Sequence, residues 1–135
     1  EVGFKRLVFS KFVKFTKMRD FRKFEVWQMS HQLTLKIYSI TKLFPKEELF
    51  GLTSQIRRSF ASIGYNISEG SGRNSDKEFA NFVNIALGSS NEAENQLILA
   101  KDLGYINEID FQNLLLELIV LKKKLVTLWS KLKEN

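Results

Sequence analysis

The residues best placed to do chemistry form one polar row at helical spacing: Arg58, Ser62, Asn66 and Glu69. Steps of four, four and three place them on one face of a helix. As a catalytic site, Glu69 would be a buried carboxylate poised for proton transfer, and Arg58 would bind a substrate. Nothing in the sequence supplies a second catalytic partner. We therefore favour a structural polar network of these four residues, which fixes the register of neighbouring helices.

Composition excludes most other catalytic and metal-binding arrangements. Cysteine is absent, so the chain has no disulfide, thiolate metal site or cysteine nucleophile. His31 is the single histidine, which excludes any site that needs two imidazoles from one chain. His31 lies at the edge of an apolar stripe, and we interpret it as a packing residue. We expect no enzyme activity, no catalytic residue, no cofactor and no metal.

The EGSGR turn at residues 69–73 could be taken for a phosphate-binding loop. It lacks the third glycine and the lysine of the usual fingerprints, and no strand precedes it. The helix that starts after it could still bind an anion beside Arg73 through free backbone N–H groups. Ser75 and Glu78, however, have the spacing of a capping box, which satisfies those donors. We favour the capping interpretation.

Positive charge is the remaining signal for a ligand, and its placement is uneven. Residues 1–23 carry eight Lys and Arg against two acidic residues, whereas residues 24–135 carry 13 of each, so the net charge of +6 lies in the N-terminal arm. A run of three lysines is typical of a solvated helix face. Outside the arm the aromatic residues occupy core positions, so a stacking platform for bases is not evident. The candidate nucleic-acid-binding residues are Arg57, Arg58, Arg73, Lys77, Lys122, Lys123, Lys124, Lys11, Lys14 and Lys17.

Four amphipathic segments must position these residues. They cover about residues 24–43, 52–69, 75–104 and 107–132, and each repeats apolar residues at steps of three and four. In the first segment Trp27, His31, Leu35 and Tyr38 flank the main apolar stripe.

The predicted helices carry start and stop signals. The residue before Pro45 ends the first helix. Gly70 is placed as a left-handed terminating residue for the second, Gly104 closes the third, and Asn107 caps the fourth. Gly88 weakens the third helix by about 1 kcal/mol relative to Ala, so we expect a neighbour to pack closely there.

The fourth helix combines a heptad seam from Phe111 to Leu132 with a second apolar edge. It should therefore contact more than one neighbour, and one of these could belong to another subunit.

Short connections and the lack of a strand signal predict an all-α fold, an antiparallel up-and-down four-helix bundle with a basic N-terminal arm. We assign residues 1–18 to a poorly ordered arm and residues 19–135 to the bundle. The arm also has the spacing of a basic amphipathic helix, with Phe4, Val8, Phe12 and Phe15 on one side. No segment approaches the roughly 20 apolar residues that span a bilayer, so we expect a cytoplasmic protein without a membrane partner.

Five motifs carry a resemblance to a known family: WQxxxxL at residues 27–33, FPxEE at 44–48, GLxxQxRR at 51–58, SIxxNIxEGxGR at 62–73 and IAxGSxxE at 85–92. The chain resembles the bacterial four-helix-bundle family of 23S rRNA intervening-sequence proteins over about residues 19–133. It is also similar to the accessory variability determinant of diversity-generating retroelements. It departs from the family pattern at Gly64 and Tyr65.

The resemblance implies a homo-oligomer, a ring of five bundles, with no established enzyme activity. It implies RNA binding, with rRNA or another structured nucleic acid as partner. It equally leaves open a protein-interaction scaffold, for example an accessory subunit of a reverse transcriptase with no direct RNA role. Arg57, Arg58, Asn66, Glu69, Gly70 and Arg73 match the family motif.

Overall fold

A computed structural model describes residues 3–6 and 19–135 of the chain. Residues 3–6 form one exposed helical turn. The rest of the arm that we predict to be poorly ordered lies outside the described residues, and with it Lys11, Lys14 and Lys17.

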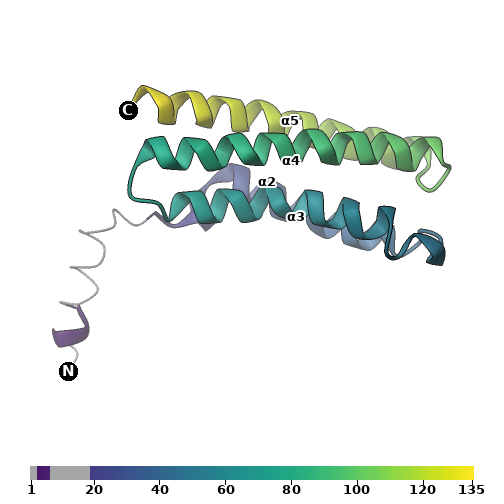
Figure 1. The fold of residues 1–135 in the computed structure, drawn as a ribbon, viewed down its shortest axis with the longest axis horizontal. Coiled ribbons are helices and arrows are strands. Elements are labelled where there is room, and N and C mark those ends of the chain that lie inside the picture. The colour runs from purple at the N-terminus through teal and green to yellow at the C-terminus, as the bar shows by residue number, and fades with distance from the viewer. Residues whose placement is uncertain (1–2, 7–18) are drawn as a thin grey trace.

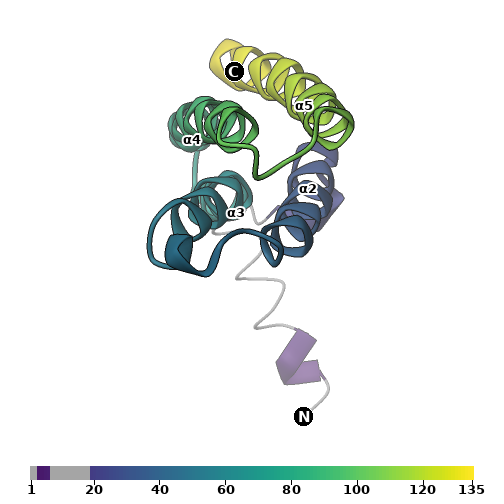
Figure 2. The ribbon, with the colours of Figure 1, turned by 90° about the vertical axis from the view of Figure 1, so that its right-hand side faces the viewer.

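Four long helices confirm the predicted all-α bundle (Figure 1). Seen along its axis, the bundle places them at four corners in the order of the chain, so that the second, Leu52–Ser71, lies diagonally opposite the fourth, Glu108–Glu134 (Figure 2). Within the described residues no helix is long and apolar enough to cross a membrane. The elements are η1 (Phe21–Lys23), α2 (Glu25–Thr41), η2 (Lys46–Glu48), α3 (Leu52–Ser71), α4 (Asp76–Asp102) and α5 (Glu108–Glu134).

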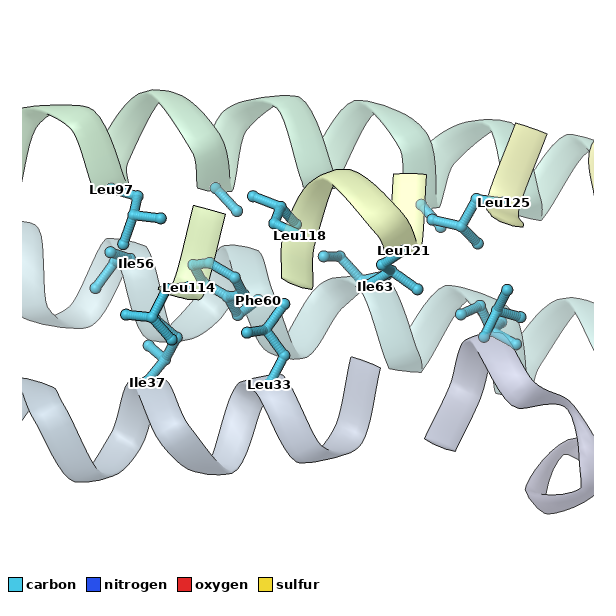
Figure 3. Close-up of a cluster of buried hydrophobic side chains, with 14 of the residues drawn as sticks. Leu33, Ile37, Ile56, Phe60, Ile63, Leu97, Leu114, Leu118, Leu121 and Leu125 are labelled. Carbon is cyan, nitrogen blue, oxygen red and sulfur yellow. The ribbon is translucent and has the colours of Figure 1, made fainter. Parts of the chain in front are cut away.

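The core is built from the predicted apolar stripes. The α3 stripe is buried throughout, and Ile56, Phe60, Ile63 and Ile67 have no exposed surface. Leucines of α5 close the core from the other side, among them Leu118 (Figure 3). Burial of each such side chain contributes about 1.5–3 kcal/mol relative to exposure, so these stripes align the polar residues between them.

Most of the predicted helix signals are confirmed. The Ser75 hydroxyl accepts a hydrogen bond from the backbone N–H of Glu78 at 3.1 Å and caps α4. The Asn107 amide oxygen accepts one from the N–H of Asp110 at 2.8 Å and caps α5. Gly104 has a φ of +80° after α4, the left-handed conformation that favours glycine.

The assignment of Gly70 as a left-handed terminator is wrong. Gly70 lies inside α3, which continues to Ser71, and Gly72 caps it in a right-handed conformation. A Cβ at position 70 would lie 2.5 Å from Phe82 Cβ and 2.9 Å from Phe79 Cδ1. The residue is glycine because α3 and α4 approach each other too closely there for a side chain.

The expectation for Gly88 is also wrong within this chain. Ala86, Ser90 and Ala93 of α4 are buried against neighbouring helices, as small residues in a close contact should be. Gly88, however, lies on the exposed side, and a Cβ added there would have no heavy atom within 4 Å. Within the described residues, nothing offsets its low helix propensity.

Arg19 joins the end of α3 to the start of α4. Its guanidinium donates hydrogen bonds to the backbone oxygens of Ser71 at 3.1 Å and Arg73 at 2.9 Å, and it forms an ion pair with Asp76. It also lies 5.2 Å from the ring centroid of Phe79. These contacts tie Arg19, the first residue of the bundle domain, to the turn between α3 and α4.

Candidate nucleic-acid interface

The predicted polar row divides into two parts. Ser62 of α3 and Ser89 of α4 share a hydrogen bond of 3.0 Å, and the Asn66 amide donates to the Ser62 hydroxyl at 3.1 Å and to its backbone oxygen at 2.8 Å. Nearby, the Ser59 hydroxyl donates to a Glu92 carboxylate oxygen at 2.9 Å. This polar seam runs between α3 and α4 and restricts how the two helices can slide, because a shift would leave these groups unpaired.

Arg58 and Glu69, the other two members of the row, lie on the surface. The Glu69 carboxylate accepts a hydrogen bond of 3.3 Å from Arg73, and its side chain is 58% exposed. Arg58 is exposed and makes no hydrogen bond or ion pair with another described residue. A carboxylate this exposed has little desolvation to make it a proton acceptor, so the geometry gives no support to proton transfer at Glu69.

Arg57 is held against α2 at one end of the bundle. Its Nε donates to the Thr41 hydroxyl at 2.8 Å, and its guanidinium lies 4.8 Å from the ring centroid of Tyr38. The side chain is therefore half-buried and fixed in direction, while its charge has no carboxylate partner among the described residues.

Arg73 and Lys77 follow the C-terminal end of α3, whose last residue, Ser71, lies about 21 Å along the helix from Arg57 at 1.5 Å per residue. Arg73 lies 4.8 Å from the ring centroid of Phe82 and pairs with Glu69. Lys77 is exposed in the first turn of α4. The backbone N–H of Glu78 donates a hydrogen bond to the Ser75 hydroxyl, as the capping interpretation predicts. The N-terminus of α4 is therefore poorly suited to bind an anion.

The three lysines of α5 point in three directions. Lys122 pairs with Glu94 of α4 at 2.9 Å, and Lys124 pairs with Glu25 of α2 at 3.1 Å. Lys123 lies between them on the outer face and is exposed without an ion pair to the described residues. These lysines lie diagonally across the bundle from the arginines of α3 (Figure 2). One copy therefore does not gather its cations into a single patch.

A groove between α2 and α3 is the main feature that sequence reasoning missed. It has a volume of about 470 Å³ and is lined by Trp27, His31, Tyr38 and Tyr65, among others. His31 is exposed and stacks on Trp27, with the ring centroids 4.8 Å apart and the planes at 12°. The expectation that aromatic residues outside the arm are confined to core positions is therefore wrong. The signal was the second stripe of α2 beside the core stripe, with Trp27, His31, Leu35 and Tyr38 at steps of four, four and three.

In the described part of the chain, no group of three or more His, Asp or Glu side chains could hold a metal ion. The Tyr105 hydroxyl joins the connector after α4 to the η2 turn, because it donates a hydrogen bond to a Glu48 carboxylate oxygen at 2.9 Å. That hydrogen bond, with some burial and the carboxylate charge, raises the pKa of Tyr105.

Comparison with known proteins places the chain in a family. The family model for 23S rRNA-intervening sequence proteins matches residues 22–127. A similar solved structure is a protein of unknown function from the S23 ribosomal protein family of Bacteroides thetaiotaomicron, with 30% sequence identity and a TM-score of 0.72 over 78% of this chain and 95% of that one. No curated protein matches at a significant level. The chain belongs to the family of 23S rRNA-intervening sequence proteins.

Proposed function

We propose that this protein is a non-enzymatic homo-oligomer, a ring of five bundles, that binds structured RNA associated with 23S rRNA intervening sequences. The observation that carries the proposal is the placement of surface cations that have no ion pair within the described residues on opposite sides of one copy, with Arg58 on α3 and Lys123 on α5. A single bundle presents each of these phosphate-binding cations only once. An oligomer repeats each cation in every copy, so that several weak phosphate contacts act together along a folded RNA.

The outer face of α4 supports assembly. Between residues 79 and 100 only Glu92 and Glu94 are charged, and both contact neighbouring helices within the chain. The exposed remainder includes Ile85, which is 52% exposed, and Leu99, which is 47% exposed. An uncharged helix face with exposed apolar side chains suits contact with another copy better than contact with water.

The N-terminal half of α5 supplies a second, unlike apolar surface, and Lys123 lies beyond it in the C-terminal half. Ile109 is 74% exposed and Leu116 is 64% exposed. A contact between two different surfaces is heterologous, and it closes into a ring when the rotation between copies allows. This argument supports a ring over a two-fold dimer.

Two measurements on the full chain test the proposal. Light scattering should give the molar mass of five copies, and a stable monomer at micromolar concentration would remove the central premise. Affinity for an RNA stem-loop should fall with salt, because each phosphate contact releases counterions. Lys123→Ala should reduce the slope of that dependence by about 1 per repeated contact, whereas a slope near zero for the wild-type protein would show that phosphates are not bound.

A protein-interaction scaffold is the second candidate. It is favoured by the formally neutral body, since residues 24–135 carry 13 basic and 13 acidic residues. A scaffold would retain a partner, such as a reverse transcriptase, after nuclease treatment of a pull-down. Loss of every partner on nuclease treatment would favour the RNA-binding function.

A further inference from the structure

The groove between α2 and α3 continues into a second hollow. The first hollow, of about 470 Å³, begins at Phe21, and the second, of about 450 Å³, ends at Phe50. Both are lined by Tyr38, Ala61 and Tyr65, so they form one groove along the two helices. We call this the α2–α3 groove.

Aromatic rings line most of its length and several are held in place. Trp27 contacts two other rings. It meets Phe21 edge to face, with the ring centroids 5.1 Å apart and the planes at 64°, and it stacks in parallel on His31. Tyr65 is 68% exposed and Tyr38 is 43% exposed, so neither ring is buried in the hydrophobic core. Flat side chains at the surface of a groove are the usual partners of unpaired bases, because every base has a face that can stack.

Gly64 sets the depth of the groove. A Cβ at position 64 would lie 3.3 Å from the Ser30 hydroxyl and 3.7 Å from Trp27 Nε1. Glycine therefore lets the Trp27 side chain settle against α3. The hydroxyl of Ser30 beside it is buried without a hydrogen-bond partner among the described residues.

The charge of the α2–α3 groove has one sign. Arg57 and Arg58 line its second hollow, and among the described residues no acidic side chain lines either hollow. Arg57 is already oriented by Thr41 and Tyr38. Arg58 is exposed and has no ion pair within the described residues. Two cations at the end of an aromatic groove match a chain that carries both flat bases and phosphates.

The dimensions also fit a short single strand. Trp27 and Tyr38 are 11 positions apart on α2, which is about 16 Å at 1.5 Å per residue. That length corresponds to about five stacked nucleotides at 3.4 Å each. A duplex keeps its bases stacked on one another, so it could not use these rings.

We infer that the α2–α3 groove binds unpaired RNA nucleotides, whose bases stack on Trp27, Tyr38 and Tyr65 and whose phosphates contact Arg57 and Arg58. The inference rests on the proposed RNA-binding function. It adds to that function a second surface, which binds single-stranded RNA in preference to duplex RNA. The lysine of α5 on the far side of the bundle would then contact paired RNA.

Tryptophan fluorescence provides a direct test. In the full chain with Trp129→Phe, Trp27 is the only indole. A twelve-nucleotide uridine oligomer should quench its fluorescence, whereas a blunt RNA duplex of twelve base pairs should not. Tyr65→Ala should weaken binding of the uridine oligomer about tenfold, because stacking on one aromatic side chain contributes about that much per base. Arg58→Ala should reduce the salt slope for the oligomer by about 0.7.

Lys123→Ala is the matched control, since it changes an exposed cation outside the groove. It should weaken binding of the duplex and leave quenching by the uridine oligomer unchanged. Tyr65 and Arg58 are exposed, so both variants should keep the wild-type circular dichroism spectrum and melting temperature.

Three results would overturn the inference. One is an absence of Trp27 quenching by the oligomer, and another is unchanged oligomer affinity in Tyr65→Ala. If duplex binding persists in either case, the proposed function survives and only the groove assignment fails; if neither RNA binds, both fail. The third is a loss of molar mass in Tyr65→Ala by light scattering, which would show that a second copy occupies the groove.

Discussion

Two glycines within helices should respond to alanine in opposite directions. At Gly70, the new Cβ would lie 2.5 Å from Phe82 Cβ and 2.9 Å from the ring of Phe79, which is fully buried. Neither atom can move without moving α4, because one is attached directly to its backbone and the other is enclosed by the core. Overpacking costs about 1–3 kcal/mol, and two contacts this short against atoms that cannot move away place the cost in the upper half of that range, about 2–3 kcal/mol. Alanine recovers about 1 kcal/mol of helix propensity, so we expect Gly70→Ala to destabilise the fold by about 1–2 kcal/mol.

Gly88→Ala is the matched control, because it makes the same chemical change in the next helix. A Cβ at position 88 has no heavy atom within 4 Å. Only the propensity term remains, so we expect Gly88→Ala to stabilise the fold by about 0.5–1 kcal/mol.

Urea denaturation followed by circular dichroism measures both changes. All three proteins should be compared at one concentration, because stability of an oligomer depends on it. With a slope of about 2 kcal/mol per molar urea, the midpoint should fall by about 0.5–1 M for Gly70→Ala and rise by about 0.3–0.5 M for Gly88→Ala.

A Gly70→Ala midpoint equal to or above that of the wild-type protein would refute the close approach of α3 and α4. A lower midpoint for Gly88→Ala, together with a lower molar mass, would show that another copy packs against Gly88. In that case the stabilisation expected for one isolated bundle would be incorrect.

Further predictions concern the junctions of the bundle and its arm. Arg19→Met should lower the unfolding free energy by about 2 kcal/mol in urea denaturation, because it removes charge-assisted hydrogen bonds to two carbonyls and Asp76; a change below about 0.5 kcal/mol, the usual limit for surface substitutions, would contradict this role. The raised pKa of Tyr105 means that its hydrogen bond stabilises the fold below pH 10 and is lost as pH rises through the folded-state value. The difference in stability between wild-type protein and Tyr105→Phe should therefore shrink above about pH 10, and a constant difference would argue against the bond to Glu48. Deletion of residues 1–17 removes five Lys and Arg residues and should reduce the salt slope for RNA; retention of the full slope would place the phosphate contacts on the bundle alone.

The periodic features of the fold could be predicted from the sequence. The stripe through Ile56, Phe60 and Ile63 identified the core face of α3, and the local signals at Ser75 and Asn107 identified two helix starts. Each of these signals depends on residues within a few positions of one another, so both partners can be recognised from a short stretch of sequence.

The features that were missed depend on residues far apart in the chain. Arg19 contacts atoms of Ser71 and Arg73, more than 50 positions away, and no local pattern marks it. Gly70 has the sequence context of a helix terminator, but its role follows from Phe79 and Phe82 on the next helix. A sequence shows where a glycine lies, but it does not show whether a backbone angle or a neighbouring helix requires it.

The α2–α3 groove is a different case, because its signal was present in the sequence. A helix at the corner of a four-helix bundle needs one apolar face, and α2 has a second stripe running from Trp27 to Tyr38 beside its core stripe. The same reasoning applied to α5 identified a second edge and predicted a further contact. For α2 we interpreted only His31, as a packing residue, and drew no consequence from the rest of the stripe, although the predicted bundle has no fifth helix to cover it. An apolar or aromatic stripe in excess of what the predicted fold can bury is therefore evidence for a ligand or partner, and on α2 the arginines that follow in α3 indicate a polyanion.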